Sequence, residues 1–292
     1  MAGRTLGLDL GGTKIAAGVL EGERLLGYLE EPTPRTGPEA ILKALVEAAR
    51  RVAPDLDVDA VGVGTPGPVD FARGVVRFAP NLPGVRDWPL KAELEAALGR
   101  PVVIENDANA AALAEHHLGA ARGARHSVYL TLSTGIGGGV IVDGRVHRGA
   151  FGQGGELGHL VVDPTGPLCG CGNRGCLEAV ASGRALERDG SYALGRLLTT
   201  PELFASGDPR AKEVIERAAY FTGIALASLQ RVLDPEVFVL GGGVALGGGE
   251  AYLKRIEAHY RAHQRNWRAA ELRLARLGRR AGVIGAALAA RV

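Results

Sequence analysis

The expected fold depends on one stretch near the N-terminus, Arg4-Thr5-Leu6-Gly7-Leu8-Asp9-Leu10-Gly11-Gly12-Thr13-Lys14-Ile15-Ala16-Ala17-Gly18-Val19-Leu20. Residues 4–10 alternate as a strand does, Gly11-Gly12-Thr13 indicates a turn, and residues 14–20 predict a return strand. A second turn at 21–23 leads into an expected third strand at 24–30. The order is therefore strand, glycine turn, strand, turn, strand.

The same order recurs roughly one domain later in the chain. Residues 127–133 predict a strand, Thr134-Gly135-Ile136-Gly137-Gly138 is the second glycine turn, and residues 139–143 predict the return strand. Another turn leads into residues 145–148. Internal repetition is a signal about the whole fold, and a period of one domain indicates a duplicated α/β unit.

The remaining elements follow from apolar periodicity. Helices are expected at 39–52, 90–98, 108–118, 210–233, from about 250, and at 281–292, and strands at 58–64, 101–105 and 236–240. Strands that alternate with helices in this way are typical of the α/β class.

Composition excludes several classes of protein. The chain has 292 residues, which suits two domains, and 46% hydrophobic residues, which suffice for a sizeable core. With 34 basic and 32 acidic residues it lacks the basic surplus of a nucleic-acid-binding protein, and we interpret the basic run 273–280 as a solvated helix end. We find neither an apolar span of membrane length nor a signal peptide, so we expect a cytoplasmic protein without a membrane partner.

The amino-acid composition also bears on the growth temperature of the source organism. The chain has one Met, few Asn and Gln residues, and many Ala, Arg, Gly and Pro residues. This profile is typical of a thermophile, although a GC-rich genome would give a similar bias.

The two glycine turns predict a phosphate-binding site. Glycine lets the backbone approach a phosphate closely and present N–H groups to its oxygens. Asp9, next to the first turn, adds a carboxylate that could act through Mg²⁺. One such turn is weak evidence because tight hairpins need glycine anyway, but two matched turns with a glycine run at 241–243 favour a nucleotide site.

Asp107 stands between an expected strand and the helix at 108–118. In open α/β folds ligands gather at such strand ends. The same position also suits a helix N-cap. Both uses stay open, and one carboxylate can serve both.

The three cysteines, Cys169, Cys171 and Cys176, fall within eight positions. In a reducing compartment clustered thiols more often hold a metal than form disulfides. Three thiolates and one imidazole make a tetrahedral structural zinc site. His159 is our candidate for the fourth ligand, and the other candidates are His116, His117, His126 and His147.

Glu156 and Glu178 flank this cysteine loop, and carboxylates accept charge-assisted hydrogen bonds from sugar hydroxyls. His159 could bind the metal through one ring nitrogen and offer the other to a sugar oxygen. Four protein ligands leave no open position, so we expect the zinc to be structural.

Taken together, these motifs resemble the ROK family of sugar kinases and repressors. The resemblance runs from residue 5 to the C-terminus. It rests on the glycine-rich stretch 132–159, the Cys-x-Cys-Gly-x-x-Gly-Cys-x-Glu box at 169–178, Asp9-x-Gly-Gly-Thr, Gly64-x-Pro-Gly-Pro, Glu105-Asn106-Asp107-Ala108-Asn109, Gly241-Gly242-Gly243 and the tail Gly282-x-x-Gly-Ala-Ala.

The resemblance implies an actin-like ATPase fold, also called ribonuclease-H-like, with duplicated α/β domains around a central cleft. It implies a small domain of residues 1–107 plus 281–292. Residues 108–280 would then form a large domain that carries the zinc-binding loop.

The resemblance further implies ATP- and Mg²⁺-dependent phosphorylation of a hexose at its 6-hydroxyl. Asp107 would be the general base. The sugar would be bound by Asn106, Asp107, Glu156, His159 and Glu178, with Asn81 as a further contact. ATP would be held by Asp9, Gly11, Gly12, Thr13, Lys14, Thr134, Gly135, Gly137 and Gly138, with Gly242 and Gly243 near the adenosine.

Three functions stay open at this point. The first is a glucokinase that also tolerates mannose or other hexoses, and the second is a kinase for fructose or N-acetylmannosamine. The third is a non-catalytic sugar sensor or repressor. Repressors of the family carry a helix-turn-helix domain ahead of the first strand, for which we see no room, so we expect no nucleic-acid partner. Family members are commonly oligomers, and we expect a homodimer or homotetramer.

Overall fold

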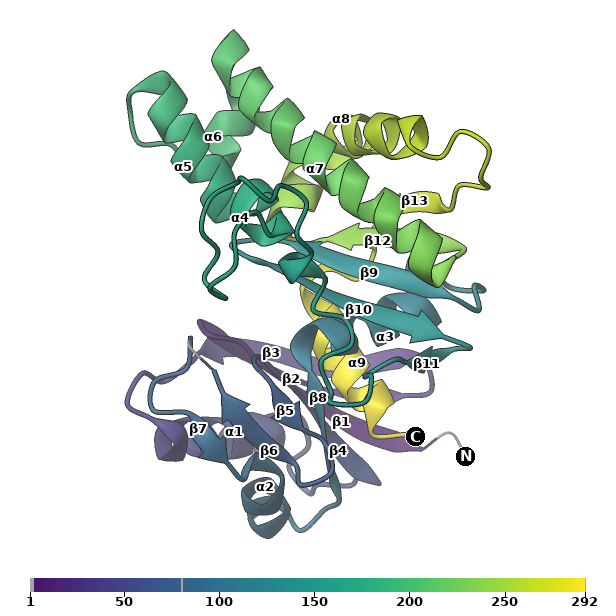
Figure 1. The fold of residues 1–292 in the computed structure, drawn as a ribbon. Helices are drawn as coiled ribbons and strands as arrows, with labels where there is room; N and C mark the ends of the chain where they lie inside the picture. The colour runs from purple at the N-terminus through teal and green to yellow at the C-terminus, as the bar shows by residue number, and fades with distance from the viewer. Residues whose placement is uncertain (1–2, 80, 292) are drawn as a thin grey trace. The chain divides into compact units, whose positions relative to one another are not determined.

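The computed structural model describes residues 3–79 and 81–291 (Figure 1). They form two compact units. The first unit contains the described residues of Met1–Leu118, Arg145–Gly154 and Arg279–Val292, and the second contains Gly119–Gly144 and Gly155–Gly278.

The first unit is built on a five-stranded sheet in the order β3-β2-β1-β4-β8. Its strands are β1 (Arg4–Leu10), β2 (Lys14–Glu21), β3 (Arg24–Pro32), β4 (Ala60–Thr65) and β8 (Val102–Asn106). Strands β1, β2 and β3 pair antiparallel, whereas β4 is parallel to both β1 and β8. The carboxyl ends of β1, β4 and β8 therefore meet at one edge of the sheet.

A second five-stranded sheet has the matching order β11-β10-β9-β12-β13 (Figure 1). Four of its strands belong to the second unit, namely β9 (Ser127–Leu132), β10 (Ile136–Val142), β12 (Val237–Gly241) and β13 (Glu271–Leu274), whereas the short strand β11 (Arg145–Val146) is counted with the first. Strand β9 is antiparallel to β10 and parallel to β12, which is parallel to β13. The predicted duplication of an α/β unit is therefore confirmed.

Helices of the first unit cover its sheet. They are α1 (Pro38–Val52), α2 (Leu90–Leu98), α3 (Asp107–Leu118) and α9 (Ala281–Ala289), and a small antiparallel sheet of β5 (Val69–Asp70), β6 (Val75–Phe78) and β7 (Arg86–Trp88) lies beside them. Helix α1 packs on β2 and α2 packs on β8. Helix α9 contacts β1, β4 and α3, so residues from both ends of the chain share one core.

The contact between α9 and its neighbours is unusually close. A Cβ atom placed on Gly285 of α9 would lie 1.6 Å from the carbonyl oxygen of Ala110 in α3. One placed on Gly62 of β4 would lie 1.7 Å from the carbonyl oxygen of Ala286. Only glycine fits at these two positions, and this explains the glycine in the tail motif.

The helices of the second unit range from 5 residues in α4 to 25 residues in α7. They are α4 (Leu177–Ala181), α5 (Gly183–Leu194), α6 (Thr200–Ala205), α7 (Pro209–Leu233) and α8 (Gly242–Ala262), and two 3₁₀ turns, η1 (Leu157–His159) and η2 (Gly278–Arg280), complete the element order. Helix α7 packs along α8, α5 and α4. In the described part of the chain, no helix has the length and apolarity needed to cross a membrane.

The observed units differ from the predicted domain ranges at three places, the shortest of which is Arg279–Arg280, in the first unit rather than the large domain. Helix α3, which was assigned to the large domain, belongs to the first unit because it packs on α9. The segment Arg145–Gly154 also belongs to the first unit, although its neighbours on both sides belong to the second.

Two predicted elements differ in detail from the structure. The second glycine turn is shorter than predicted, because the N–H of Ser133 bonds the carbonyl of Gly135 and β10 begins at Ile136. Gly137 and Gly138 are therefore strand residues. The basic run 273–280 begins in β13, and only its last residues, in η2, lead into the start of α9. The helix predicted from about 250 is present after non-helical backbone at Gly249, but a short helical segment from Gly242, which was not predicted, precedes it within α8.

Candidate functional site

The junction between β8 and α3 carries Asn106 and Asp107. The Oδ1 atom of Asn106 accepts the N–H groups of Ala108 at 2.9 Å and Asn109 at 3.2 Å. That is the bonding pattern of an N-cap. The Oδ1 atom of Asp107 accepts the N–H of the next residue, Ala108, at 2.8 Å. Because α3 begins at Asp107, Asn106 occupies the N-cap position that the sequence left open for Asp107.

Asp9 lies near the end of β1, where it pairs with Gly64 of β4. A Cβ placed on Gly64 would lie 3.6 Å from Oδ1 of Asp9 and 3.7 Å from Cα of Asp107. Burial, and after it the negative charges of Asp107 and Glu30, together raise the pKa of Asp9 from 3.8 to about 7. The three carboxylates therefore create a site where a cation would be favourable.

Replacing Asp9 by Asn is expected to stabilise the protein in a pH-dependent way. Because the pKa of Asp9 in the folded state is above 3.8, its ionisation opposes folding. The resulting loss of free energy of unfolding is absent below pH 3.8 and grows as the pH rises to about 7. Above that pH the loss stays constant at about 4 kcal/mol. Asp9→Asn should therefore raise the free energy of unfolding by several kcal/mol at pH 8 and hardly at all at pH 4.

Urea denaturation at both pH values, without Mg²⁺ or nucleotide, measures this difference. An equal gain at pH 4 and pH 8 would show that charge at Asp9 is not the cause.

The turn between β1 and β2 gathers several predicted residues. The N–H of Gly11 bonds the carbonyl of Lys14 at 2.8 Å, and Thr33 donates its hydroxyl to the carbonyl of Gly11 at 2.7 Å. A Cβ placed on Gly12 would lie 2.8 Å from Nδ2 of Asn81, so the Asn81 side chain lies against this turn. Predicted sugar and phosphate residues of the first unit are therefore neighbours.

The second glycine turn holds one of the predicted sugar ligands. Oε2 of Glu178 accepts the N–H of Ile136 at 2.9 Å. A Cβ placed on Gly135 would lie 2.5 Å from the same oxygen, so a larger residue there would displace the Glu178 carboxylate. Glu178 therefore connects the turn with the first helical turn of α4.

A pocket of about 530 Å³ opens beside this second turn. Thr134 and Gly243, both predicted as nucleotide contacts, line it. Sequence reasoning missed its other walls, which are Ser133, Gly183, Glu187, Thr200, Pro201, Phe204, Ala205, Val244 and Gly247. Thr199 and Glu202 form a capping box at the start of α6, and this Thr-x-x-Glu signal could have located that wall.

The predicted zinc ligands come together in space. The donor atoms of His159, Cys169, Cys171 and Cys176 all lie within 4.8 Å of one another. Nδ1 of His159 is 3.6 Å from Sγ of Cys169, and the sulfurs of Cys171 and Cys176 are also 3.6 Å apart. Tetrahedral zinc with such ligands separates its donors by about 3.5–3.8 Å, so the set fits. No other histidine of the described residues belongs to this cluster.

The thiols of this cluster differ in acidity. Burial raises the pKa of Cys176 to about 12, whereas a hydrogen bond from the backbone N–H of Asn173 lowers the pKa of Cys171. A thiol must lose its proton to bind a metal, so metal binding here would release protons.

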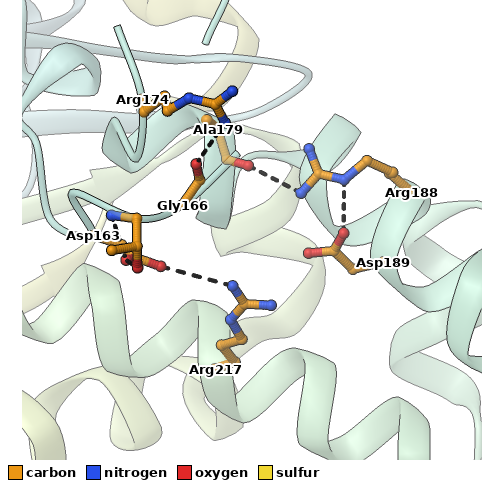
Figure 2. A network of polar contacts seen from close by, with 8 residues as sticks. Asp163, Gly166, Arg174, Ala179, Arg188, Asp189 and Arg217 are labelled. Atoms are coloured by element: carbon orange, nitrogen blue, oxygen red, sulfur yellow. Dashed lines mark hydrogen bonds and ion pairs between the residues drawn. The ribbon is translucent and has the colours of Figure 1, made fainter. Parts of the chain in front are cut away.

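Polar contacts hold the loop that carries the cysteines, α4, α5 and α7 together, and one of them joins the loop to α7 (Figure 2). Arg217 of α7 pairs with Asp163 at 3.9 Å, and Nη1 of Arg174 donates to the carbonyl of Gly166 at 3.5 Å. Arg188 of α5 donates to the carbonyl of Ala179 at 3.1 Å and pairs with Asp189 at 2.7 Å. Glu156 and His159 lie at the entry to this loop, where Glu156 precedes η1 and its carbonyl accepts the N–H of His159.

Comparison with known proteins agrees with this site. The model of the ROK family matches residues 5–292. A glucokinase of Streptomyces coelicolor is 42% identical over 99% of this chain and 98% of its own length. A crystal structure of a ROK hexokinase from Thermus thermophilus is 58% identical, with a TM-score of 0.93 over 99% of this chain and 98% of that one.

A ROK family glucokinase from Streptomyces griseus, solved in complex with glucose and AMPPNP, is 40% identical. Its TM-score is 0.84, over 99% of both chains. These likenesses span the whole chain and include both units and the cysteine loop. The chain belongs to the ROK family.

Proposed function

We propose that this chain is an ATP-dependent hexose kinase that phosphorylates glucose at its 6-hydroxyl. The observation that carries the proposal is the β8–α3 junction, where Asn106 caps the helix and Asp107 stands next to the strand end that bears Asp9. Glucose as the substrate is supported by the glucokinases that the chain resembles over its full length.

In the proposed reaction Asp107 hydrogen-bonds the 6-hydroxyl and takes its proton as the bond to phosphorus forms. Phosphoryl transfer passes through a loose transition state, so positioning contributes much of the rate. A well-placed general base typically contributes about 10²- to 10⁴-fold. Asn106, Glu156, His159, Glu178 and Asn81 are the proposed sugar-binding residues.

ATP is proposed to bind through the two glycine turns and the pocket beside the second. The first turn would contribute Gly11, Gly12, Thr13 and Lys14, and the second Thr134, Gly135, Gly137 and Gly138. The pocket of about 530 Å³ has the size of a nucleoside site and includes Gly243, with Gly242 adjacent. Bound Mg²⁺ would offset the phosphate charge, and the raised pKa of Asp9 marks the place where a cation would be most favourable.

Zinc is the metal that we propose for the Cys₃His cluster, in a structural role. The donors fit tetrahedral geometry, and the facing atom of His159 is Nδ1. Its Nε2 would then be left for a sugar oxygen, with ring orientation and tautomer fixed by the metal.

The test of the proposed function is a coupled assay of ADP formation with purified protein and glucose, mannose, fructose and N-acetylmannosamine. We expect the highest kcat/KM with glucose. A higher value with another sugar would reassign the substrate within the same reaction class. Absence of turnover with every sugar would contradict the kinase and favour a sensor.

We further propose a homodimer or homotetramer. Large apolar side chains stay exposed on the second unit, among them Tyr192 and Leu197, each 91% exposed. Size-exclusion chromatography with light scattering measures the mass, and a monomer at all concentrations would contradict the proposal.

The nucleoside pocket can be tested by filling it. Ala205 is an exposed residue at the end of α6 that lines the pocket. Ala205→Trp should raise the KM for ATP at least about 10-fold, since losing roughly 1.4 kcal/mol of nucleotide binding suffices. The KM for glucose should change little. Ala262→Trp, at the exposed end of α8 and outside the pocket lining, is the matched control. Equal ATP kinetics in both variants would place the adenosine elsewhere.

A further inference from the structure

Glu105 is a fully buried carboxylate directly before Asn106 in β8. Its Oε1 atom accepts the N–H of Asn106 at 2.9 Å and Nδ2 of Asn109 at 3.0 Å. These two partners stand on either side of Asp107 in the sequence. One oxygen of Glu105 therefore ties the end of the strand to the first turn of α3.

The other oxygen of Glu105 binds Arg148. Nε of Arg148 donates to Oε2 at 2.9 Å and Nη2 donates to the same atom at 2.5 Å. The guanidinium also lies over the ring of Phe71, 5.1 Å from its centroid. Both neighbours belong to the first unit, as does the segment Arg145–Gly154 that supplies Arg148.

A buried carboxylate is stable only when it is paired and hydrogen-bonded. Glu105 meets both conditions. Its Oε1 atom accepts the hydrogen bonds of the β8–α3 junction, and its Oε2 atom pairs with the guanidinium of Arg148. Arg148 supplies two donors from a rigid planar group, which the single ammonium of Lys does not reproduce.

We propose that Arg148 is a positioning residue for phosphoryl transfer, which acts through Glu105 on Asn106 and Asp107. The inference rests on the proposed function of Asp107. The Nε and Nη2 groups of the guanidinium donate to Glu105 and its face lies on Phe71, so its effect on the reaction is transmitted through the carboxylate.

Removing the cation should move the junction. Without Arg148, Oε2 of the buried Glu105 would lack its charged partner and would seek other donors or water. Oε1 would then hold Asn106 and Asn109 less firmly. Displacing a catalytic group by about 1 Å can lower the rate of reaction roughly 100-fold. A smaller displacement of Asp107 is therefore expected to lower kcat about 10- to 100-fold.

The experiment compares Arg148→Gln, Arg148→Lys and the double variant Glu105→Gln with Arg148→Gln. For each, kcat and KM for glucose are measured, with the glucose Kd by calorimetry without ATP and Tm as a check on folding. Arg148→Gln should lower kcat about 10- to 100-fold with a smaller change in glucose KM. Arg148→Lys should recover part of the loss.

The double variant should recover most of kcat, because a neutral amide at 105 still accepts from Asn106 and needs no cation. Arg145→Gln, on the same segment and exposed, is the control and should resemble the wild type. If Arg148→Gln does not fold, the double variant and Arg148→Lys still test the pair.

Two results would overturn the proposal. If the double variant is as slow as Arg148→Gln, then Arg148 acts on the substrate directly and not through Glu105. If Arg148→Gln turns over like the wild type, the pair does not position the base. Failure of the wild type to phosphorylate any sugar would instead reject the proposed function, so the two failures are separable.

Discussion

Asp107→Asn is expected to lower kcat at least about 100-fold while glucose still binds. The amide has nearly the shape of the carboxylate and can hydrogen-bond the sugar, but it cannot accept a proton at neutral pH. Single-turnover and steady-state kinetics with glucose and ATP measure the loss, and calorimetry measures the remaining glucose affinity.

Asp87→Asn is the matched control for this change. Asp87 is an exposed residue of the first unit that pairs with Arg77, and surface pairs contribute about 0–1 kcal/mol. We expect wild-type kinetics for it. An Asp107→Asn enzyme that keeps most of its kcat would remove Asp107 from the role of base.

Cys171→Ser is expected to lower zinc content, thermal stability and glucose affinity together. Structural zinc contributes about 10–16 kcal/mol of apparent binding energy in small zinc peptides, so one lost ligand should release the metal and loosen the loop. Since Cys171 is exposed, serine should be tolerated there apart from the metal. Elemental analysis, thermal denaturation and calorimetry with glucose give the three readouts.

Leu168→Ala, an exposed position on the same loop, is the control for the zinc variant. It should keep its zinc and its glucose affinity. Full zinc content in Cys171→Ser would remove Cys171 from the ligand set. A zinc-free protein with normal glucose affinity would break the proposed link from the metal through His159 to the sugar.

Much of the fold could be predicted because its local signals are strong. Residues 4–10 and 90–98 were predicted with the bounds that β1 and α2 have. Alternation of buried residues defines the first, and Gly99 in left-handed conformation ends the second. The repeated order of strands was readable because both hairpins share the same turn chemistry.

The elements that were missed are short and lack a periodicity of their own. Strands β5 to β7 have two to four residues each, and α4 and α6 have five and six. Such pieces are stable only through tertiary contacts. Gly138 was assigned to a turn because glycine usually indicates one, whereas here it makes room for Leu157, whose Cδ1 would lie 2.6 Å from a Cβ at that position.

In the candidate site, too, residues close together in the sequence were predictable, whereas partners far apart in the sequence were not. Cys169, Cys171 and Cys176 are close in sequence, so their cluster with His159 was predictable, and the structure brings these donors together. The pair of Glu105 and Arg148 joins residues 43 positions apart, and no pattern in either segment indicates it. The walls of the pocket beside the second turn come from four separate segments, of which the sequence indicated only Thr134, Gly243 and, through its capping box, the start of α6.

The close packing of Gly285 against Ala110 has a consequence for how the chain folds while it is being synthesised. Helix α9 is synthesised after the other described elements, yet it completes the core of the unit that contains β1. The first unit therefore lacks α9 and cannot complete its core while residues 119–278 are synthesised and begin to fold. During that interval the apolar residues of β1, β4 and α3 that later receive α9 lack their partner, so a nascent chain stalled before residue 281 would be a substrate for chaperones.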